Sequence, residues 1–463
     1  MIQLDRTRTP ADLLPSINRL FEISAGKIRS LEQSWSVANG APVFTVDGRY
    51  TARGWTEWTE GFQYGSSLLQ FDATGERDFL ELGRDRTLTR MAPHLTHMGV
   101  HDHGFNNVST YGALWRMARE GKINAHEWEV RFYELALKVS GAVQARRWTT
   151  IKDGGFIHSF NGAHSLFVDT IRSLRALALA HQLGHRLVEE QDAQVNLLSR
   201  LVQHARATAT YNVFRGTSGG PFDVRGRVAH ESLFNVANGT YRGPSTQQGY
   251  SPFSTWTRGL AWAMLGFAEQ LEFVSTLAST ALAETGDSDV TEWMLDAARA
   301  TCDFYIDVAA CADGVPYWDT GAPGLATLDD WESRPADPFN DREPVDSSAA
   351  AIGAQGLLRF GRFLNMRGQD GTRYWQAGLR VAETLFDPAG PYLSQAESHQ
   401  GLLLHSVYHW PNGWDFVPPG AHVPRGESSQ WGDYHAREVA LYLLRIAKDE
   451  PYLAFFGPTL SNV

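Results

Sequence analysis

The chain has 463 residues, of which 43% are hydrophobic and 20% are charged, and its formal net charge at pH 7 is −11. This composition is typical of a globular enzyme with a large core. The negative charge, without any basic block, argues against a sequence-independent hold on nucleic-acid phosphates. No apolar run approaches the roughly 20 residues that a membrane-spanning helix needs, so neither nucleic acid nor a membrane is an expected partner.

The N-terminal segment and the cysteines indicate a reducing compartment. Residues 1–21 have no basic region followed by an apolar stretch, so they predict no secretion signal. Cys302 and Cys311 are the only cysteines, and their spacing gives no zinc pattern. So few cysteines in a chain of this length suit a reducing environment, and we expect a cytoplasmic protein.

Apolar residues recur with a helical period along most of the chain. Trp128, Phe132, Leu135 and Val139 lie at spacings of four, three and four residues, which predicts an amphipathic surface helix with these residues toward the core. Positions 164–184 are apolar nearly all round and predict a buried helix. In chain order we expect helices at 11–33, 58–72, 76–98, 104–120, 124–146, 164–184, 188–206, 254–273, 287–309, 346–366, 370–388 and 429–447.

The predicted helices alternate in character. Every second one begins with a Gly- or Trp-rich motif and has small or apolar residues on all faces, whereas the others carry the charge. Six buried helices ringed by six amphipathic ones describe an all-α (α/α)6 toroid around one central cavity. We expect residues 1–463 to form a single catalytic domain, because no linker is visible. An α-solenoid is the alternative, but no fixed-period repeat supports it.

Long loops interrupt this pattern at 207–253, 312–345 and 391–428, and the first contains a short β excursion. Loops of this length in a compact domain are usually functional. Several tryptophans occur in loops rich in Gly, Pro or Asp: Trp55, Trp58, Trp318, Trp410, Trp414 and Trp431. An aromatic ring at loop level packs against the apolar face of a pyranose, so sugar binding is one interpretation and core packing is the other.

The predicted inner helices begin with similar motifs, among them "HDHGF" at 101–105 and "LFVDT" at 166–170. In a toroid these N-termini converge, and their free N–H groups favour anions. We therefore expect Asp102, Asp169, Asp346 and Asp433 near one pocket. Helix capping is the alternative for each, and it is the preferred one for Asp346.

Asp169 lies in an apolar helix whose other polar residues are Arg172 and Ser173. A salt bridge to Arg172 is one interpretation. The other is a proton donor with Asp102 as the second carboxylate, because a buried carboxyl beside another carboxylate has a raised pKa. Two carboxyl groups flanking a bond are the minimum equipment of a glycosidase.

Other catalytic patterns are weak or absent. His101 and His103 precede a helix and have no companion metal-binding motif, so we expect no metal. The sequence contains neither a Gly-x-Ser-x-Gly nucleophile motif nor a Walker-type phosphate loop.

Taken together, the motifs resemble the unsaturated glucuronyl hydrolases, glycoside hydrolase family 88, and more distantly family 105. "WTEGFQYG" is similar to the family's Trp-Thr-Asp-Gly-Phe segment, and "HDHGF" is similar to its His-Asp-x-Gly-Phe. Further similar segments, in the same order, are "QGYSPFSTWTRGLAWAMLGFA", "DGVPYWDTGAP", "DSSAAAIGAQGLL", "GLLLHSVYH" and "WGDY". The resemblance covers most of the chain, from residue 55 to residue 445.

The resemblance implies hydration of a vinyl ether. Polysaccharide lyases leave a 4,5-unsaturated uronic acid at the non-reducing end of an oligosaccharide. In the family an Asp protonates C4, water adds at C5, and the hemiketal opens to release a keto acid. By resemblance Asp169 is the acid/base, and Asp102 holds the sugar hydroxyls and raises the pKa of Asp169. No cofactor is implied.

The resemblance also implies a set of substrate-binding residues. His230, Gln248 and Arg258 would contact the uronate and its hydroxyls, while Trp58 and Trp262 would be stacking walls. The full set is His101, His230, Gln248, Arg258, Trp262, Trp58, Phe160 and Trp431. The expected partner is an oligosaccharide that ends in a uronic acid.

The chain departs from the family pattern at a few positions. Ser173 and Phe160 stand where the family has Asn and Trp, His103 is an extra imidazole, and insertions near 324–343 and 410–427 lengthen the rim. The alternatives are an exo-acting inverting β-glucuronidase on saturated glucuronides and a non-catalytic sugar-binding toroid. Inversion requires carboxyl groups roughly 6.5–9.5 Å apart. The parent polysaccharide, the linkage, sulfate tolerance and homo-oligomerisation are not determined by the sequence.

Overall fold

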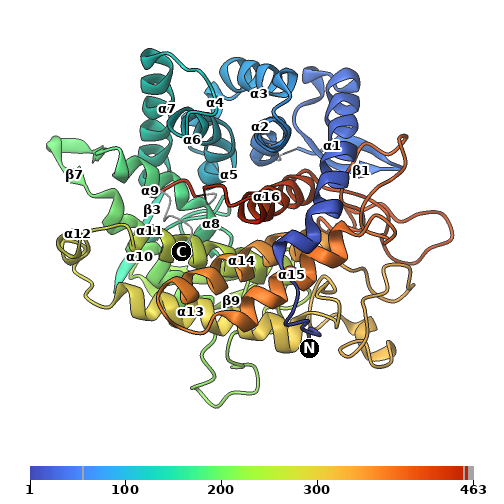
Figure 1. The fold of residues 1–463 in the computed structure, drawn as a ribbon. Coiled ribbons are helices and arrows are strands. Elements are labelled where there is room, and N and C mark those ends of the chain that lie inside the picture. The colour runs from blue at the N-terminus through green and yellow to red at the C-terminus, as the bar shows by residue number, and fades with distance from the viewer. Residues whose placement is uncertain (55–56, 452–453, 457–463) are drawn as a thin grey trace.

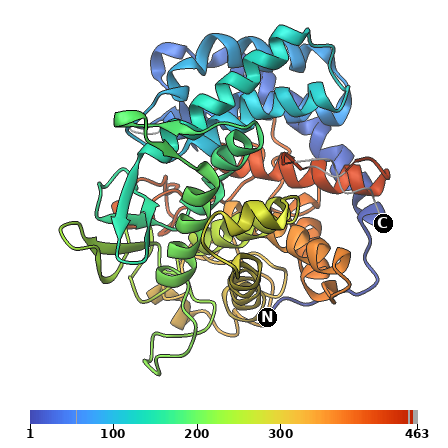
Figure 2. The ribbon, with the colours of Figure 1, turned by 90° about the vertical axis from the view of Figure 1, so that its left-hand side faces the viewer.

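The computed structural model describes residues 1–54, 57–451 and 454–456, and its helices form an inner and an outer layer (Figures 1 and 2). The inner helices are α2 (Glu60–Thr74), α5 (His103–Asn107) continuing into α6 (Ala113–Arg119), α8 (Thr170–Ser173) with α9 (Arg175–Gln182), α11 (Thr257–Val274), α14 (Ser347–Met366) and α16 (Gln430–Ala447). The outer helices are α1 (Leu14–Ser34), α3 (Arg77–Arg90) with α4 (Ala92–Leu95), α7 (Glu127–Arg146), α10 (Leu197–Tyr211), α13 (Val290–Phe304) and α15 (Thr372–Phe386).

The inner helices close into a ring. In chain order α2 packs on α5 and α6, α5 on α8, α8 on α11, α11 on α14, and α14 on α16. The ring closes because α16 returns to α2, and Figure 1 shows α16 crossing the view between α2 and α14. Among the described residues the predicted (α/α)6 toroid is therefore confirmed, with one extra short helix, α12 (Ser279–Ala283).

Short antiparallel strands lie between the helices. They are β1 (Pro42–Val46), β2 (Arg49–Ala52), β3 (Trp148–Ile151), β4 (Gly154–Ile157), β5 (Ser165–Phe167), β6 (Leu187–Val188), β7 (Gln194–Val195), β8 (Glu231–Asn235) and β9 (Thr240–Ser245). The predicted β excursion at 207–253 contains β8 and β9, which join β5 in one three-stranded sheet. The segment "TYNVF", predicted as a strand, instead begins inside α10.

Two predicted helices begin later than their sequence pattern indicates. The segment 164–184 is helical only from Thr170, because its first residues pair with β8 as a strand. The segment 188–206 becomes α10 only after Asn196, whose side chain caps the helix by accepting from the N–H groups of Leu198 and Ser199. Short apolar runs do not distinguish strand from helix by periodicity alone.

The orientation predicted for α7 is wrong. Trp128, Phe132 and Leu135 are 65%, 37% and 58% exposed, whereas the opposite side of the helix is buried. α7 packs on α9 through small residues: a Cβ built on Gly141 would lie 2.4 Å from Cβ of Ala180. Close contact between two helix backbones requires small side chains, so the bulky apolar residues face outward.

Buried ion pairs tie three inner helices together. The Arg172 guanidinium on α8 lies 2.8 Å from a carboxylate oxygen of Glu269 on α11 and 2.7 Å from one of Glu438 on α16, and all three side chains are at most 1% exposed. Buried charges persist only when paired, so these contacts hold the ring together at its centre. The salt bridge proposed from sequence between Arg172 and Asp169 is therefore replaced by this network.

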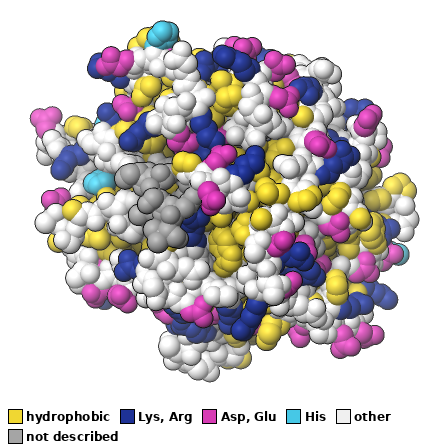
Figure 3. Space-filling view, viewed as in Figure 1, with side chains coloured by type: hydrophobic (Ala, Val, Ile, Leu, Met, Phe, Trp, Pro, Cys, Tyr) yellow, Lys and Arg dark blue, Asp and Glu magenta, His cyan; other side chains and the backbone are white. Residues whose placement is uncertain are grey.

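The outer surface is mixed in character. Acidic and basic side chains are interspersed with apolar ones on the face shown in Figure 3. In the part of the chain that the structure describes, no helix combines the length and apolarity needed to cross a membrane.

We expect Glu438→Gln to lower the free energy of unfolding by about 3–5 kcal/mol, because Arg172 would keep its buried charge with one carboxylate missing. Urea denaturation measures this change. The matched control is Arg131→Gln, which removes an exposed pair with Glu127 and should alter stability by less than about 0.5 kcal/mol. Equal effects of the two substitutions would contradict a central role for the network.

Candidate active site

A cavity of about 700 Å³ lies where the inner helices begin. It is lined by residues at the N-terminal ends of α2, α5, α8 and α11 and by the loops before α5, before β5 and after position 407. The predicted convergence therefore holds for four of the six inner helices, and the starts of α14 and α16 are not among the residues that line this cavity. Of the ten site residues predicted from sequence, the wall contains Trp58, His101, Asp102, Phe160, Asp169, Gln248, Arg258 and Trp262.

Two carboxyl groups and one imidazole form the centre of the cavity wall. Asp102 directly precedes α5 and Asp169 directly precedes α8, and they are 7% and 9% exposed. Neither side chain caps its helix, so the capping alternative fails for both. Nε2 of His101 contacts both carboxyl groups, at 3.2 Å from Oδ1 of Asp169 and 3.7 Å from Oδ1 of Asp102.

The two carboxyl groups have opposite pKa shifts. Burial raises the pKa of Asp102 to about 6, and the charge of Asp169 adds to this while His101 opposes it. Burial also acts to raise the pKa of Asp169, but the charge and hydrogen bond of His101 oppose burial, and the net effect is a lowered pKa. The expectation of a raised pKa at Asp169 is therefore wrong for this structure, because the sequence did not place His101 against this carboxyl.

Hydrogen bonds from Ser173 fix the "HDHGF" turn to the helix that follows Asp169. The Ser173 hydroxyl donates to the carbonyl of His101 at 2.7 Å and accepts from the N–H of Gly104 at 2.8 Å. Gln144 donates to both the His101 carbonyl and the Ser173 hydroxyl. A Cβ on Gly104 would lie 2.2 Å from the carbonyl oxygen of Ser173, so only glycine allows this approach.

His103 faces away from His101. Its Nδ1 lies 3.0 Å from the Ser140 hydroxyl and its Nε2 lies 2.9 Å from the carbonyl oxygen of His97. Burial lowers the pKa of His103 to about 4, so the ring is neutral. The two imidazoles of the motif therefore have separate environments. Among the described residues, no group of three or more His, Cys, Asp or Glu side chains is arranged to hold a metal ion.

Arg258 lines the cavity, but its terminal nitrogens donate to protein oxygens. They bond Asp346 at 3.0 Å, Oε1 of Gln248 at 2.7 Å, the carbonyl of Tyr408 at 2.7 Å, and the carbonyl of Val407. The guanidinium thus holds the side chain of Gln248 in the wall and fastens the loop at 407–408 to α11.

His230 lies behind the wall rather than in it. Its Nδ1 accepts from the backbone N–H groups of Gln247 and Gln248, and its ring packs on Phe167 and Trp256 at 4.5 and 4.6 Å between centroids. Burial lowers its pKa to about 4. His230 is therefore not part of the cavity wall, and it supports the segment that carries Gln248.

Three of the four predicted aromatic residues, Trp58, Trp262 and Phe160, line the cavity. Trp58 lines the cavity and stacks on Trp431, with centroids 5.1 Å apart and planes at 26°. Trp431 is fully buried and donates from Nε1 to Ser348, so its predicted place at the substrate is wrong and it supports Trp58 from behind. Phe160, 42% exposed, stacks on His101. The predicted loop residue Trp55 lies outside the described residues.

The loop 391–428, expected from its length and composition to be functional, completes the wall, although Tyr408 and His409 were not named as site residues. Tyr408, His409 and Trp414 line the cavity, and Asp415 holds this loop by accepting from the N–H groups of Tyr408 and His409. The aromatic residues in "YHWPNGW", residues 408–414, are the sequence feature that points to this part of the wall.

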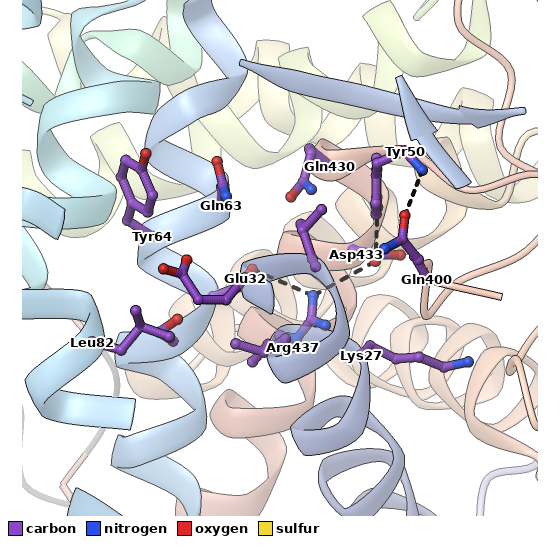
Figure 4. Close-up of a pocket in the computed structure, with 14 residues that line it drawn as sticks. Lys27, Glu32, Tyr50, Gln63, Tyr64, Leu82, Gln400, Gln430, Asp433 and Arg437 are labelled. Atoms are coloured by element: carbon purple, nitrogen blue, oxygen red, sulfur yellow. Dashed lines mark hydrogen bonds and ion pairs between the residues drawn. The ribbon is translucent and has the colours of Figure 1, made fainter. Parts of the chain in front are cut away.

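Asp346 and Asp433 lie away from the cavity wall. Asp346 caps α14, as preferred from the sequence, and also pairs with Arg258. Asp433 lines a second, much smaller pocket, where Figure 4 shows it between Tyr50 and Arg437. It also accepts from the N–H of Leu402 at 2.9 Å. The prediction that all four aspartates share one pocket therefore holds for two of them.

We expect Ser173→Ala to lower the free energy of unfolding by about 1–3 kcal/mol, because it leaves the buried N–H of Gly104 without an acceptor. Chemical denaturation measures the change. Ser288→Ala is the control, since Ser288 is exposed and bonds only its neighbour Asp289. A Ser173→Ala protein as stable as the control would show that the turn is held by other contacts.

Comparisons with known proteins identify relatives over nearly the whole chain. No family model matches the sequence. The unsaturated glucuronyl hydrolase of Bacillus sp. strain GL1 is 26% identical over 412 residues, covering 86% of this chain and 89% of that protein. An unsaturated chondroitin disaccharide hydrolase of Streptococcus agalactiae is 23% identical, covering 88% and 85%.

Solved structures have the same fold. The crystal structure of an unsaturated glucuronyl hydrolase specific for heparin aligns with a TM-score of 0.69 and 19% identity, covering 94% of this chain and 98% of that one. The crystal structure of the Bacillus sp. GL1 enzyme aligns with a TM-score of 0.67 and 22% identity, covering 93% and 96%.

Proposed function

We propose that this chain, a homologue of the unsaturated glucuronyl hydrolases, hydrates the 4,5-double bond of an unsaturated uronic acid. The sugar stands at the non-reducing end of a lyase-generated oligosaccharide and leaves as a keto acid. The observation that carries this proposal is the pair Asp102 and Asp169, which face one cavity and both contact the His101 imidazole.

The names of the relatives support the substrate class. They include glucuronyl hydrolases and unsaturated chondroitin disaccharide hydrolases. Two solved complexes of such enzymes hold oligosaccharides named dGlcA-Glc-Rha-Glc and dGlcA-GalNAc6S. Both ligands begin with dGlcA, so an unsaturated glucuronate is the group that we expect this cavity to take.

The reaction needs one proton and one water. Asp169 protonates C4 of the vinyl ether, positive charge develops at C5, and water adds there. The Asp169 carboxylate accepts the proton of that water, and the hemiketal opens to release the keto acid. Asp102 accepts hydrogen bonds from sugar hydroxyls beside the reacting carbons. Such proton transfer typically contributes 10²–10⁴-fold to a rate.

The walls suit a charged sugar ring. Trp58, Trp262 and Phe160 provide apolar faces, and Gln248, held by Arg258, provides an amide at the polar side. We assign the ring stacking to the aromatic residues and the hydroxyl contacts to Gln248.

Saturated β-glucuronides are the less favoured substrate. An inverting glycosidase holds a water between carboxyl groups roughly 6.5–9.5 Å apart. Here an oxygen of each carboxyl group lies within 4.0 Å of one imidazole nitrogen, which argues against a water held by both carboxyl groups at that point.

We further propose that the whole chain acts as one cytoplasmic catalytic domain. The N–H of Ile2 bonds the carbonyl of Ile306, and a β-bridge joins Phe44 to Ser429, so distant segments are packed together. Cys302 and Cys311 are buried and unpaired, which suits a reducing compartment.

We expect the wild-type protein to remove the ultraviolet absorbance of the C4=C5 bond from at least one lyase-generated unsaturated disaccharide. Asp169→Asn should lower kcat by at least about 100-fold, since an amide cannot donate the proton that C4 receives. The Kd for substrate should be nearly unchanged, because Asn and Asp side chains have nearly the same shape. Asp153→Asn, an exposed carboxyl, is the control and should be fully active. Constant absorbance on the whole panel, with glucuronate released from a saturated glucuronide, would instead establish the glucuronidase.

We expect kcat/KM to fall on the acid side with an apparent pKa near that of Asp102, about 6. Asp102 must be a carboxylate to accept hydrogen bonds from the sugar hydroxyls, so activity is present above this pH and lost as pH falls through it. A pH–rate profile on the preferred disaccharide measures this acid limb. Asp102→Asn should remove it, and an acid limb that persists in this variant would contradict the assignment.

A further inference from the structure

His101 is fixed at the point from which one nitrogen reaches both carboxyl groups. Its ring is 2% exposed and lies between Phe160, parallel at 15° with centroids 6.3 Å apart, and Phe167, edge-on at 84° and 5.7 Å. Because its backbone is also held by Ser173, the ring has little freedom to turn. Nε2 therefore stays within reach of both carboxyl groups, at 3.2 and 3.7 Å.

The other ring nitrogen has a different environment. Nδ1 of His101 is buried and has no hydrogen-bond partner in the described part of the chain. A nitrogen without a donor or acceptor nearby exchanges its proton poorly, whereas Nε2 bonds Asp169 at 3.2 Å and has an oxygen of Asp102 at 3.7 Å. Proton movement at His101 is therefore confined to Nε2, which is within reach of both carboxyl groups.

We propose that His101 is a positioning residue that carries the transferable proton between Asp102 and Asp169, and this inference rests on the proposed function. One mobile proton has three sites, Nε2 and a carboxylate oxygen of each aspartate. When it moves to Asp169, the Nε2–H bond breaks and an O–H bond forms. An imidazolium with two carboxylates becomes a neutral imidazole, one carboxylic acid and one carboxylate, so charge is conserved.

The hydration step then restores the starting state. Asp169 gives its proton to C4 of the sugar and becomes a carboxylate. The water that adds at C5 releases a proton to this carboxylate, which can pass it back to Nε2 of His101. The enzyme therefore ends each cycle with the proton count with which it began, and no further acid or base is required.

The charges around His101 favour this proton. Burial lowers its pKa, but the two carboxylates outweigh burial and raise it overall. Arg147 is the cation that opposes them, and it is anchored by donating to backbone carbonyls such as that of Ser159 at 2.7 Å. The neighbouring imidazoles of His158, His204 and His230 are neutral, since burial lowers their pKa values to about 4, 3 and 4.

The test compares two histidines of one motif. His101→Gln keeps an N–H donor but carries no titratable proton, so we expect kcat to fall by about 100-fold and KM to change by less than about threefold. The acid limb set by Asp102 should move to higher pH by about one unit, because the His101 charge that lowers the Asp102 pKa is removed. His103→Gln is the matched control, because His103 touches neither carboxyl, and it should retain kcat within about threefold. A loss of packing alone would lower stability without moving the pH profile.

The results of these experiments distinguish a failure of the proposed function from a failure of the role proposed for His101. A wild-type protein inactive on every unsaturated disaccharide overturns the proposed function. An active wild type together with a His101→Gln protein of equal kcat and pH profile overturns only the role of His101.

A second measurement avoids dependence on the folding of His101→Gln. In wild-type protein with ¹³C-labelled histidine, the Cε1 resonance of His101 should titrate, and its midpoint should fall in Asp102→Asn because one carboxylate charge is removed. A resonance of His101 that is unaffected by this substitution would overturn the proposal.

Discussion

The pairing of Arg172 with Glu269 and Glu438 is the interaction on which the rest of the structure depends. A guanidinium at the centre of the ring cannot be left unpaired, so it fixes α8, α11 and α16 relative to one another. These two pairs also engage Arg172 itself, which lies three residues after Asp169 and could otherwise have formed an i,i+3 ion pair with it. Asp169 is therefore free to face the cavity, with an imidazole rather than a permanent cation as its partner.

The partner of Asp169, an imidazole and not an arginine, sets how readily this carboxyl group can take up a proton. A carboxylate held by an arginine stays ionised across the working pH range, whereas one held by an imidazole can receive a proton from it. Asp102 has the same neighbour at a longer distance, so burial dominates its pKa and the two carboxyl groups differ. Proton donors and acceptors of differing pKa in one cavity are what acid–base chemistry at a sugar requires.

The surrounding residues hold this arrangement in place. Ser173 locks the turn that carries His101 and Asp102 to the helix that carries Asp169. Arg258 and His230 were expected at the substrate, but here they hold Gln248 and its backbone. Residues that resemblance assigns to binding can thus act through a neighbour, and only their contacts distinguish the two roles.

The sequence by itself determined the helices, their alternation between inner and outer layers, and the motifs at the helix starts, because period and capping are local properties of the chain. Only the tertiary structure decided which way α7 faces, that Trp431 lies behind Trp58, and which carboxyl has the raised pKa. Each of these depends on a partner distant in sequence, such as His101 for Asp169. Local patterns contain no information about such neighbours, since packing and electrostatics act through space.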